Sequence, residues 1–147
     1  MFAAYEKLLS KLDESVARIE KLHVGHLQCR SGCADCCGQI LSFYRVEIDS
    51  VIDYLLGLEA GERARILAHL EEFRAAGWQT PCPLLEDGRC LVYPARPLLC
   101  RSHGLLFNTS EVAQKALIER SCYLNYTDID AAEIPLSETL NQKLLSL

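Results

Sequence analysis

The side chains most able to carry out chemistry in this sequence are its eight cysteines, in a chain of 147 residues. Four of them fall within nine residues: Cys29, Cys33, Cys36 and Cys37. Two residues separate Cys33 from Cys36, and this spacing lets two sulfurs converge on one ion because the chain between them closes a tight turn. The first group therefore predicts a metal-binding loop. Since adjacent side chains diverge, either Cys36 or Cys37 serves a second metal, or only one of the two is a ligand.

A second, more widely spaced group consists of Cys82, Cys90 and Cys100. The sequence between the first two predicts a hairpin with its tip at residues 86–89, where Gly88 supplies a positive φ. Such a hairpin brings the sulfurs of Cys82 and Cys90 together, and a proline-fixed turn over residues 94–97 could return Cys100 to them. Cys122 stands alone, and an eighth ligand and a buried small apolar side chain are equally good interpretations of it.

The softness of the donor atoms narrows the choice of metal. Thiolates select zinc, iron–sulfur clusters or cuprous copper over magnesium and calcium. Zinc bound by four thiolates would contribute folding free energy to a loop-rich segment. The C-x3-C-x2-C spacing from Cys29 to Cys36 also fits three corners of a [4Fe-4S] cluster. We favour zinc, because structural zinc sites are frequent in cytosolic proteins, and keep an iron–sulfur cluster as the alternative.

Cationic side chains also lie in or close to the cysteine segments. A metal centre bound by four thiolates carries net negative charge, which guanidinium groups can offset by donating to sulfur. We expect Arg101, next to Cys100, to act in this way, and His103 to be a better candidate nitrogen ligand than the other histidines. The candidate arginines are Arg30, Arg45, Arg96 and Arg101, and the further candidate histidines are His23 and His26.

The expected compartment decides how clustered cysteines are interpreted, because disulfides form in oxidising environments and metal sites predominate in reducing ones. Charged residues recur throughout the first 21 residues, unlike a secretory signal. We therefore expect a cytoplasmic protein whose reduced thiols bind a metal ion. No apolar stretch approaches the roughly 18 residues that a membrane-spanning helix needs. A net charge of −5 also provides no positive potential that would attract the phosphates of a nucleic acid. Neither a membrane span nor a nucleic-acid partner is expected.

Hydrophobic periodicity predicts a mainly α fold. Apolar residues in steps of three and four indicate helices over residues 5–22, 48–57 and 60–76, with further helices beginning at Ser110 and Ser137. Residues 40–46 are aromatic and β-branched and predict an extended stretch. The side chains expected to face inward are Ile48, Val51, Ile52, Leu55 and Leu56 in the second helix and Ile66, Leu67, Leu70 and Phe73 in the third. We expect one small helical domain, residues 1–147, with an irregular, hairpin-containing, cysteine-rich metal-binding segment.

The cysteine pattern resembles that of a known family. The order Cys29-x3-Cys33-x2-Cys36-Cys37, then residues 82–84, then the run from Gly88 to Arg101, is similar to the YkgJ-type cysteine-cluster family, a zinc- or iron-chelating domain. The resemblance covers about residues 29–103. Cys122 and the C-terminal tail lie outside the motif. The resemblance implies that the chelating set consists of Cys29, Cys33, Cys36, Cys37, Cys82, Cys90 and Cys100.

Three classes of function follow from such a centre, and one of them, metal storage or delivery, needs weaker, exchangeable binding and a solvent-accessible cluster. In the first, zinc closes the loops of a structural or interaction module, whose helices present a surface to a protein partner. In the second, an iron–sulfur cluster supports electron transfer or a redox modification. The sequence has no glycine-rich phosphate loop, no serine nucleophile elbow and no HExxH helix, so it indicates no catalytic residue and leaves enzymatic activity open.

Overall fold

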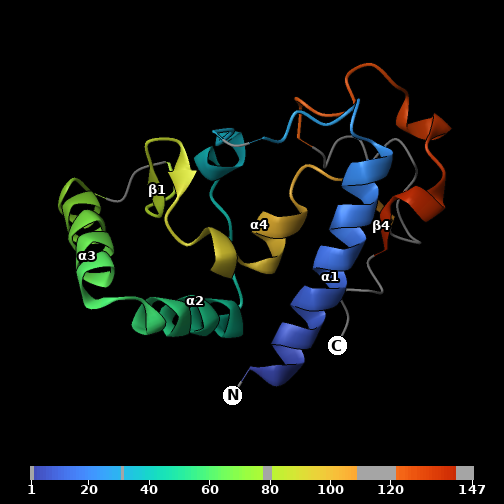
Figure 1. Cartoon of the computed structure of the whole chain (residues 1–147). Helices are drawn as coiled ribbons and strands as arrows, with labels where there is room; N and C mark the ends of the chain where they lie inside the picture. Colours follow the sequence, from blue (N-terminus) through green and yellow to red (C-terminus); the bar gives the residue numbers. More distant parts are fainter. Residues whose placement is uncertain (1, 31, 78–80, 109–121, 142–147) are drawn as a thin grey trace. The chain divides into compact units, whose positions relative to one another are not determined.

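A computed structural model describes residues 2–30, 32–77, 81–108 and 122–141 (Figure 1). By its internal contacts the chain divides into two compact units. The terminal unit comprises Met1–Cys29 and Leu98–Leu147, and the central unit comprises Arg30–Pro97. The assignment of residues 1–147 to a single domain stays a prediction.

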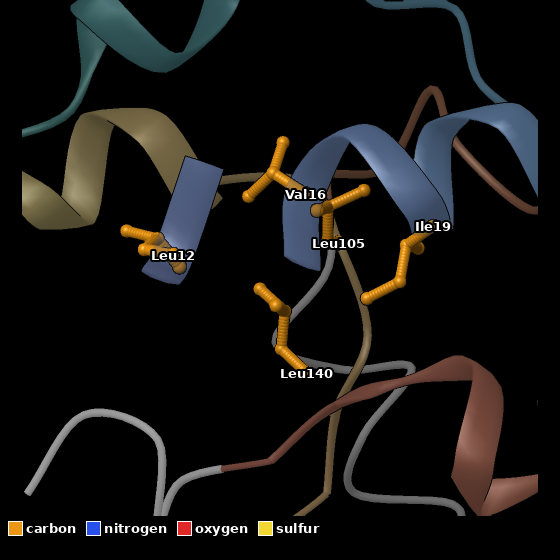
Figure 2. Close-up of a cluster of buried hydrophobic side chains, with 5 residues drawn as sticks. All are labelled: Leu12, Val16, Ile19, Leu105 and Leu140. Carbon is orange, nitrogen blue, oxygen red and sulfur yellow. The ribbon is translucent and has the colours of Figure 1, made fainter. Parts of the chain in front are cut away.

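The terminal unit is organised by its long first helix. Its elements are α1 (Ala3–Leu22), α4 (Leu98–Ser102), β3 (Phe107–Asn108), the 3₁₀ turns η3 (Ala131–Glu133) and η4 (Leu136–Glu138), and β4 (Leu140–Asn141). The helix predicted over residues 5–22 is confirmed as α1, and it buries the apolar face that periodicity indicated. Figure 2 shows a buried cluster formed by three side chains of α1, one residue that precedes β3 and one residue of β4: Leu12, Val16, Ile19, Leu105 and Leu140. A second buried cluster contains Leu106, Tyr126, Ala131 and Ile134.

The end of the described chain corrects a prediction. The helix expected to begin at Ser137 is wrong for residues 137–141, where a 3₁₀ turn is followed by strand β4. Leu140 pairs with Phe107 of β3 in a short parallel ladder, and its N–H donates to the Leu106 carbonyl at 2.8 Å. Burial of Leu140 against α1 therefore overrides the local helical period. The helix predicted from Ser110, and the remainder of the last one, lie outside the described residues.

The central unit combines two helices with irregular, cysteine-bearing segments. Its elements are η1 (Asp35–Gly38), α2 (Arg45–Gly57), α3 (Ala60–Ala75), β1 (Leu85–Glu86), β2 (Arg89–Cys90) and η2 (Tyr93–Ala95). Helix α2 begins at Arg45, so the extended stretch predicted over 40–46 ends two residues early. The start is fixed by Glu47, whose carboxylate accepts a hydrogen bond from the Tyr44 N–H at 2.7 Å. Helix α3 ends at Ala75, close to the predicted end at residue 76, and Gly77 follows it with a φ of +88°.

The helices of the central unit bury less apolar surface than their periodicity predicted. Val51 is buried as expected in α2, but Ile48, Ile52 and Leu56 are 41%, 47% and 63% exposed. In α3 Ile66 is fully buried, whereas Leu67 is 49% exposed. The inward assignment of these four exposed side chains is wrong, because each short helix buries only a narrow stripe. Within the described ranges, no helix is both long enough and apolar enough to cross a membrane.

A short hairpin joins β1 to β2. The strands pair antiparallel, with Leu85 opposite Cys90 and Glu86 opposite Arg89. Both residues of the connecting turn, Asp87 and Gly88, have positive φ, as a tight two-residue hairpin turn requires. Glu86 also forms a salt bridge with Arg65, which ties the hairpin to α3. The predicted part of this hairpin in metal binding stays a prediction.

Candidate metal centre

Backbone contacts bring three cysteine-bearing segments of the central unit together. Cys36 and Cys37 lie on the 3₁₀ turn η1, and the Cys82 N–H donates to the Cys37 carbonyl at 2.7 Å. The Leu85 N–H donates back to the Cys82 carbonyl at 3.0 Å, forming a turn that leads directly into β1. Because Leu85 pairs with Cys90 across the hairpin, Cys90 is carried to the same region. The hairpin therefore carries Cys90 toward the turn that contains Cys82, and the predicted meeting of their sulfurs on a metal stays a prediction.

Burial and neighbouring thiols disfavour the ionised form of Cys37. The pKa of Cys37 is raised from 9.0 to about 12, first by burial and then by the charges of Cys36, Cys82 and Cys90. The pKa of Cys90 is also raised, mainly by burial, although the Val92 backbone and Arg96 act in the opposite direction. A metal cation among these sulfurs would replace their mutual repulsion with attraction, at the cost of displacing protons.

The terminal unit contains the other thiols whose surroundings are resolved in detail. Asn125 is buried, and its Nδ2 donates to the Gly104 carbonyl at 2.9 Å and to the Cys29 sulfur at 3.4 Å. Its Oδ1 accepts from the Gln28 N–H at 2.8 Å. Cys122 packs beside the same glycine: a Cβ added to Gly104 would lie 3.2 Å from the Cys122 Cβ and 3.5 Å from the Cys29 sulfur.

The predicted cysteines are therefore found in two places. Those brought together in the central unit are Cys36, Cys37, Cys82 and Cys90. Cys33 belongs to the same unit, where its N–H closes a turn onto the Arg30 carbonyl at 3.0 Å. Cys29 lies in the terminal unit with Cys122, and half-buried Cys100 lies there on α4. All eight cysteines fall within the described residues, and none of them forms a disulfide.

The neighbouring charged residues only partly follow the sequence-based expectation. Arg101 donates to both carboxylate oxygens of Asp13 on α1, at 2.8 and 3.0 Å, so its clearest role is to fix α4 against α1. The charge of Arg96 opposes the burial that raises the pKa of Cys90, and the Arg96 guanidinium lies 3.6 Å from the centre of the Tyr93 ring. Sequence reasoning included Arg96 among its candidates but favoured Arg101.

The histidines have separate surroundings. His103 is partly buried, and burial lowers its pKa below the ordinary value of 6.5. His26 binds Asp128 at 2.9 Å, and the buried His23 lies 3.3 Å from Glu138. Asn125 was missed from the sequence altogether, because a single asparagine in a turn-rich segment carries no motif. Its role becomes visible only when residues 28, 29 and 104 are seen around it.

The chemistry of the donor set can be tested against the metals that the sequence suggested. Thiolates fit zinc and iron, since both bind sulfur strongly. Among the described residues, however, no three side chains of histidine, cysteine, aspartate or glutamate already have the arrangement of a metal site. The thiols of Cys36, Cys82 and Cys90 are close enough to Cys37 to influence its ionisation. The residues fit a soft metal by type and by neighbourhood.

Comparison with known proteins agrees with this chemistry. The family model CxxCxxCC, described as "Putative zinc- or iron-chelating domain", matches residues 28–123, about two thirds of the chain. The match includes all eight cysteines, so it extends beyond the motif recognised in the sequence and takes in Cys122. No curated protein and no solved structure matches the chain. The chain belongs to the CxxCxxCC family of zinc- or iron-chelating domains.

Proposed function

We propose that this protein is a zinc-binding structural module, and that the thiolates of Cys36, Cys37, Cys82 and Cys90 form the core of its metal site. The observation that carries the proposal is the approach of their segments within one unit, where the Cys82 N–H donates to the Cys37 carbonyl and Leu85 pairs with Cys90. The four thiols come from three segments separated in sequence, and the contacts around Cys82 and the β1–β2 ladder hold those segments together. Four thiolates are the ligand set of many structural zinc sites.

The small core of the central unit gives zinc a physical role. Among its described residues, the buried apolar side chains are Val51, Ile66 and Val92. So small a core contributes little stability to a unit of this size, and small domains commonly compensate with a structural metal or disulfides. The cysteines form no disulfide, so a metal is the cross-link that fits. A reducing compartment such as the cytoplasm suits this proposal, because it keeps the thiols available as ligands.

An iron–sulfur cluster is the competing function, supported by the C-x3-C-x2-C spacing of the first cysteine group. Such a cluster would supply one-electron transfer. In either case the protein's own contribution is the same: it presents thiolates, excludes part of the solvent from them and places Arg96 beside Cys90. Zinc is preferred because a structural role requires no additional reaction partner.

The test is anaerobic purification of the whole chain, followed by elemental analysis and a visible spectrum of the same sample. Stoichiometric zinc and a colourless protein that unfolds when chelated support the proposal. Iron with acid-labile sulfide and a bleachable visible band replace it with the iron–sulfur function. Retention of neither metal after reconstitution refutes both.

A matched pair of variants locates the site. Cys90→Ser removes a proposed ligand, whereas Arg89→Ser changes its exposed neighbour on the same strand to the same residue. The first is expected to lose metal and the second to retain it. Equal retention by the two variants would show that the hairpin does not contribute to the site.

A further inference from the structure

Helix α2 of the central unit, labelled in Figure 1, carries a row of exposed apolar side chains. Ile48, Ile52 and Leu56 follow one another at every fourth position, and all three are exposed. Residues four apart are neighbours on the surface of a helix, so these side chains form one continuous ridge, the α2 ridge. Tyr44, directly before α2, continues the spacing and is 80% exposed.

The size and shape of the α2 ridge fit a helix of a partner. Single exposed apolar side chains are ordinary in folded proteins, whereas a continuous exposed row marks a surface that binds something. The ridge extends about 12 Å along the axis of α2, at roughly 1.5 Å per residue, which matches about two turns of a helix lying against it. Helices bind such surfaces through apolar side chains at steps of three and four residues.

A second row, directly beside the α2 ridge, is acidic. Asp49 and Asp53 each follow a residue of the ridge by one position. Arg45 binds Asp49 at 2.7 Å and offsets its charge, whereas Asp53 is exposed and forms no ion pair within the described part of the chain. Glu59, which is also exposed, follows the C-terminal end of α2. The border of the ridge therefore carries net negative charge.

This charge distinguishes between the occupants that an apolar ridge accepts. A second copy of the chain would bring the same acidic border toward itself across a two-fold axis, and like charges oppose that contact. An anionic membrane surface would repel the border as well. A helix with Lys or Arg beside its apolar face complements both rows, and the net charge of −5 favours the approach of a cationic partner.

We propose that the α2 ridge and its acidic border form a docking surface for a basic amphipathic helix of a partner protein. The inference goes beyond the proposed metal site, because it uses no cysteine and applies equally to a zinc-binding and an iron–sulfur protein. The hydrophobic period of α2 assigned Ile48, Ile52 and Leu56 to the core, and their exposure in the structure is what reveals the surface.

The test uses the whole chain and two labelled synthetic peptides of about 18 residues, roughly five helical turns. One peptide has leucines in steps of three and four and lysines at the other positions, and its counterpart has glutamates in place of the lysines. We expect the lysine peptide to bind at least about tenfold more tightly in fluorescence anisotropy, and to lose affinity as salt is added. Equal affinity for the two peptides, or no binding of the lysine peptide, would overturn the proposal.

Matched variants locate the surface. Leu56→Ala and Leu67→Ala make the same change at exposed leucines of α2 and α3. The first is expected to weaken binding of the lysine peptide about tenfold and the second to leave it unchanged. Equal effects of the two variants would overturn the location.

The acidic border is tested separately. Asp53→Asn is expected to weaken binding of the lysine peptide about threefold and to reduce its salt dependence. Glu72→Gln, which removes one exposed charge from α3, should change neither. Asp53→Asn also decides the location if Leu56→Ala does not fold, as judged by circular dichroism, and no effect of Asp53→Asn would overturn the part of the proposal that concerns charge.

The other occupants are outcomes of two further measurements. Sedimentation of the wild type should show a monomer, and the chain should not pellet with vesicles that contain phosphatidylserine. A dimer that Leu56→Ala dissociates would show that α2 joins two copies of the chain. Pelleting that Leu56→Ala abolishes would assign the surface to lipid. Either result would overturn the assignment to a basic helix.

Discussion

Substitution of Gly104 by alanine tests the packing of Asn125, Cys122 and Cys29 around this glycine most directly. The added Cβ would lie 2.8 Å from the Asn125 Nδ2, closer than such atoms approach in folded proteins, and 3.2 Å from the Cys122 Cβ. Gly77 provides a matched control, since its φ of +88° is nearly the same as the +89° of Gly104 but no heavy atom lies within 4 Å of its added Cβ. The two variants therefore share the backbone strain and differ in the contacts.

The expected magnitudes follow from these differences. An alanine in the left-handed region costs roughly 1–2 kcal/mol, offset by roughly 0.4–1 kcal/mol from the lower entropy of the unfolded chain. Gly77→Ala should therefore lower the free energy of unfolding by about 1 kcal/mol. At Gly104, displacement of Asn125 weakens its bonds to Gly104 and Cys29 and adds overpacking of roughly 1–3 kcal/mol, giving a total of about 3 kcal/mol.

The assay is chemical denaturation of both variants and the wild type, followed by circular dichroism, together with zinc content. Gly104→Ala should shift the midpoint about three times as far as Gly77→Ala and should also lower metal retention. Equal shifts for the two variants would refute the packing of Asn125, Cys29 and Cys122 around Gly104. A large shift with full metal retention would separate the packing from the metal site.

Three further predictions concern the terminal unit. Tyr126→Phe removes a buried hydroxyl that has no hydrogen-bond partner among the described residues. The free energy of unfolding, measured by denaturation, should therefore stay the same or rise by up to about 1 kcal/mol. A clear decrease would show that the hydroxyl has a partner. The substitution should also remove a phenol titration near pH 12, because burial raises the pKa of Tyr126 to about 12, and this is measured by ultraviolet titration. Burial holds the pKa of His103 below 6.5, so the unfolded chain binds a proton there more readily than the folded chain. Stability should therefore fall as the pH drops through 6.5. His103→Gln should make the denaturation midpoint depend less on pH in this range, and an unchanged dependence would contradict the prediction. Asp13→Asn weakens the two hydrogen bonds from Arg101, whose side chain is 12% exposed, and should lower the free energy of unfolding by about 1–2 kcal/mol at both low and high salt. An effect near zero in denaturation would mark the contact as a surface ion pair.

Local chemistry explains which parts of the fold were predictable. The period of three and four identified α1 because its buried face is continuous from Tyr5 to Ile19. The end of the third helix was predictable because a helix end favours glycine, and Gly77 there has a positive φ. The hairpin followed from Asp87-Gly88, whose residue types suit its turn. The inward faces of α2 and α3 were overestimated, since periodicity cannot say how much apolar surface the rest of the unit will cover. The strand at Leu140 was missed because its pairing partner, Phe107, lies 33 residues away.

The site divides in the same way. The sequence alone determined that the chain binds a soft metal, since clustered thiols define the donor chemistry whatever the fold, and the family match agrees. Only the tertiary structure decided which sulfurs become neighbours. It grouped Cys36, Cys37, Cys82 and Cys90 through a hairpin, and it placed Cys122 beside Cys29 on Gly104. Spacing in sequence describes turns of a few residues, whereas the approach of Cys29 and Asn125 closes a separation of 96 residues and depends on the buried core that holds both segments.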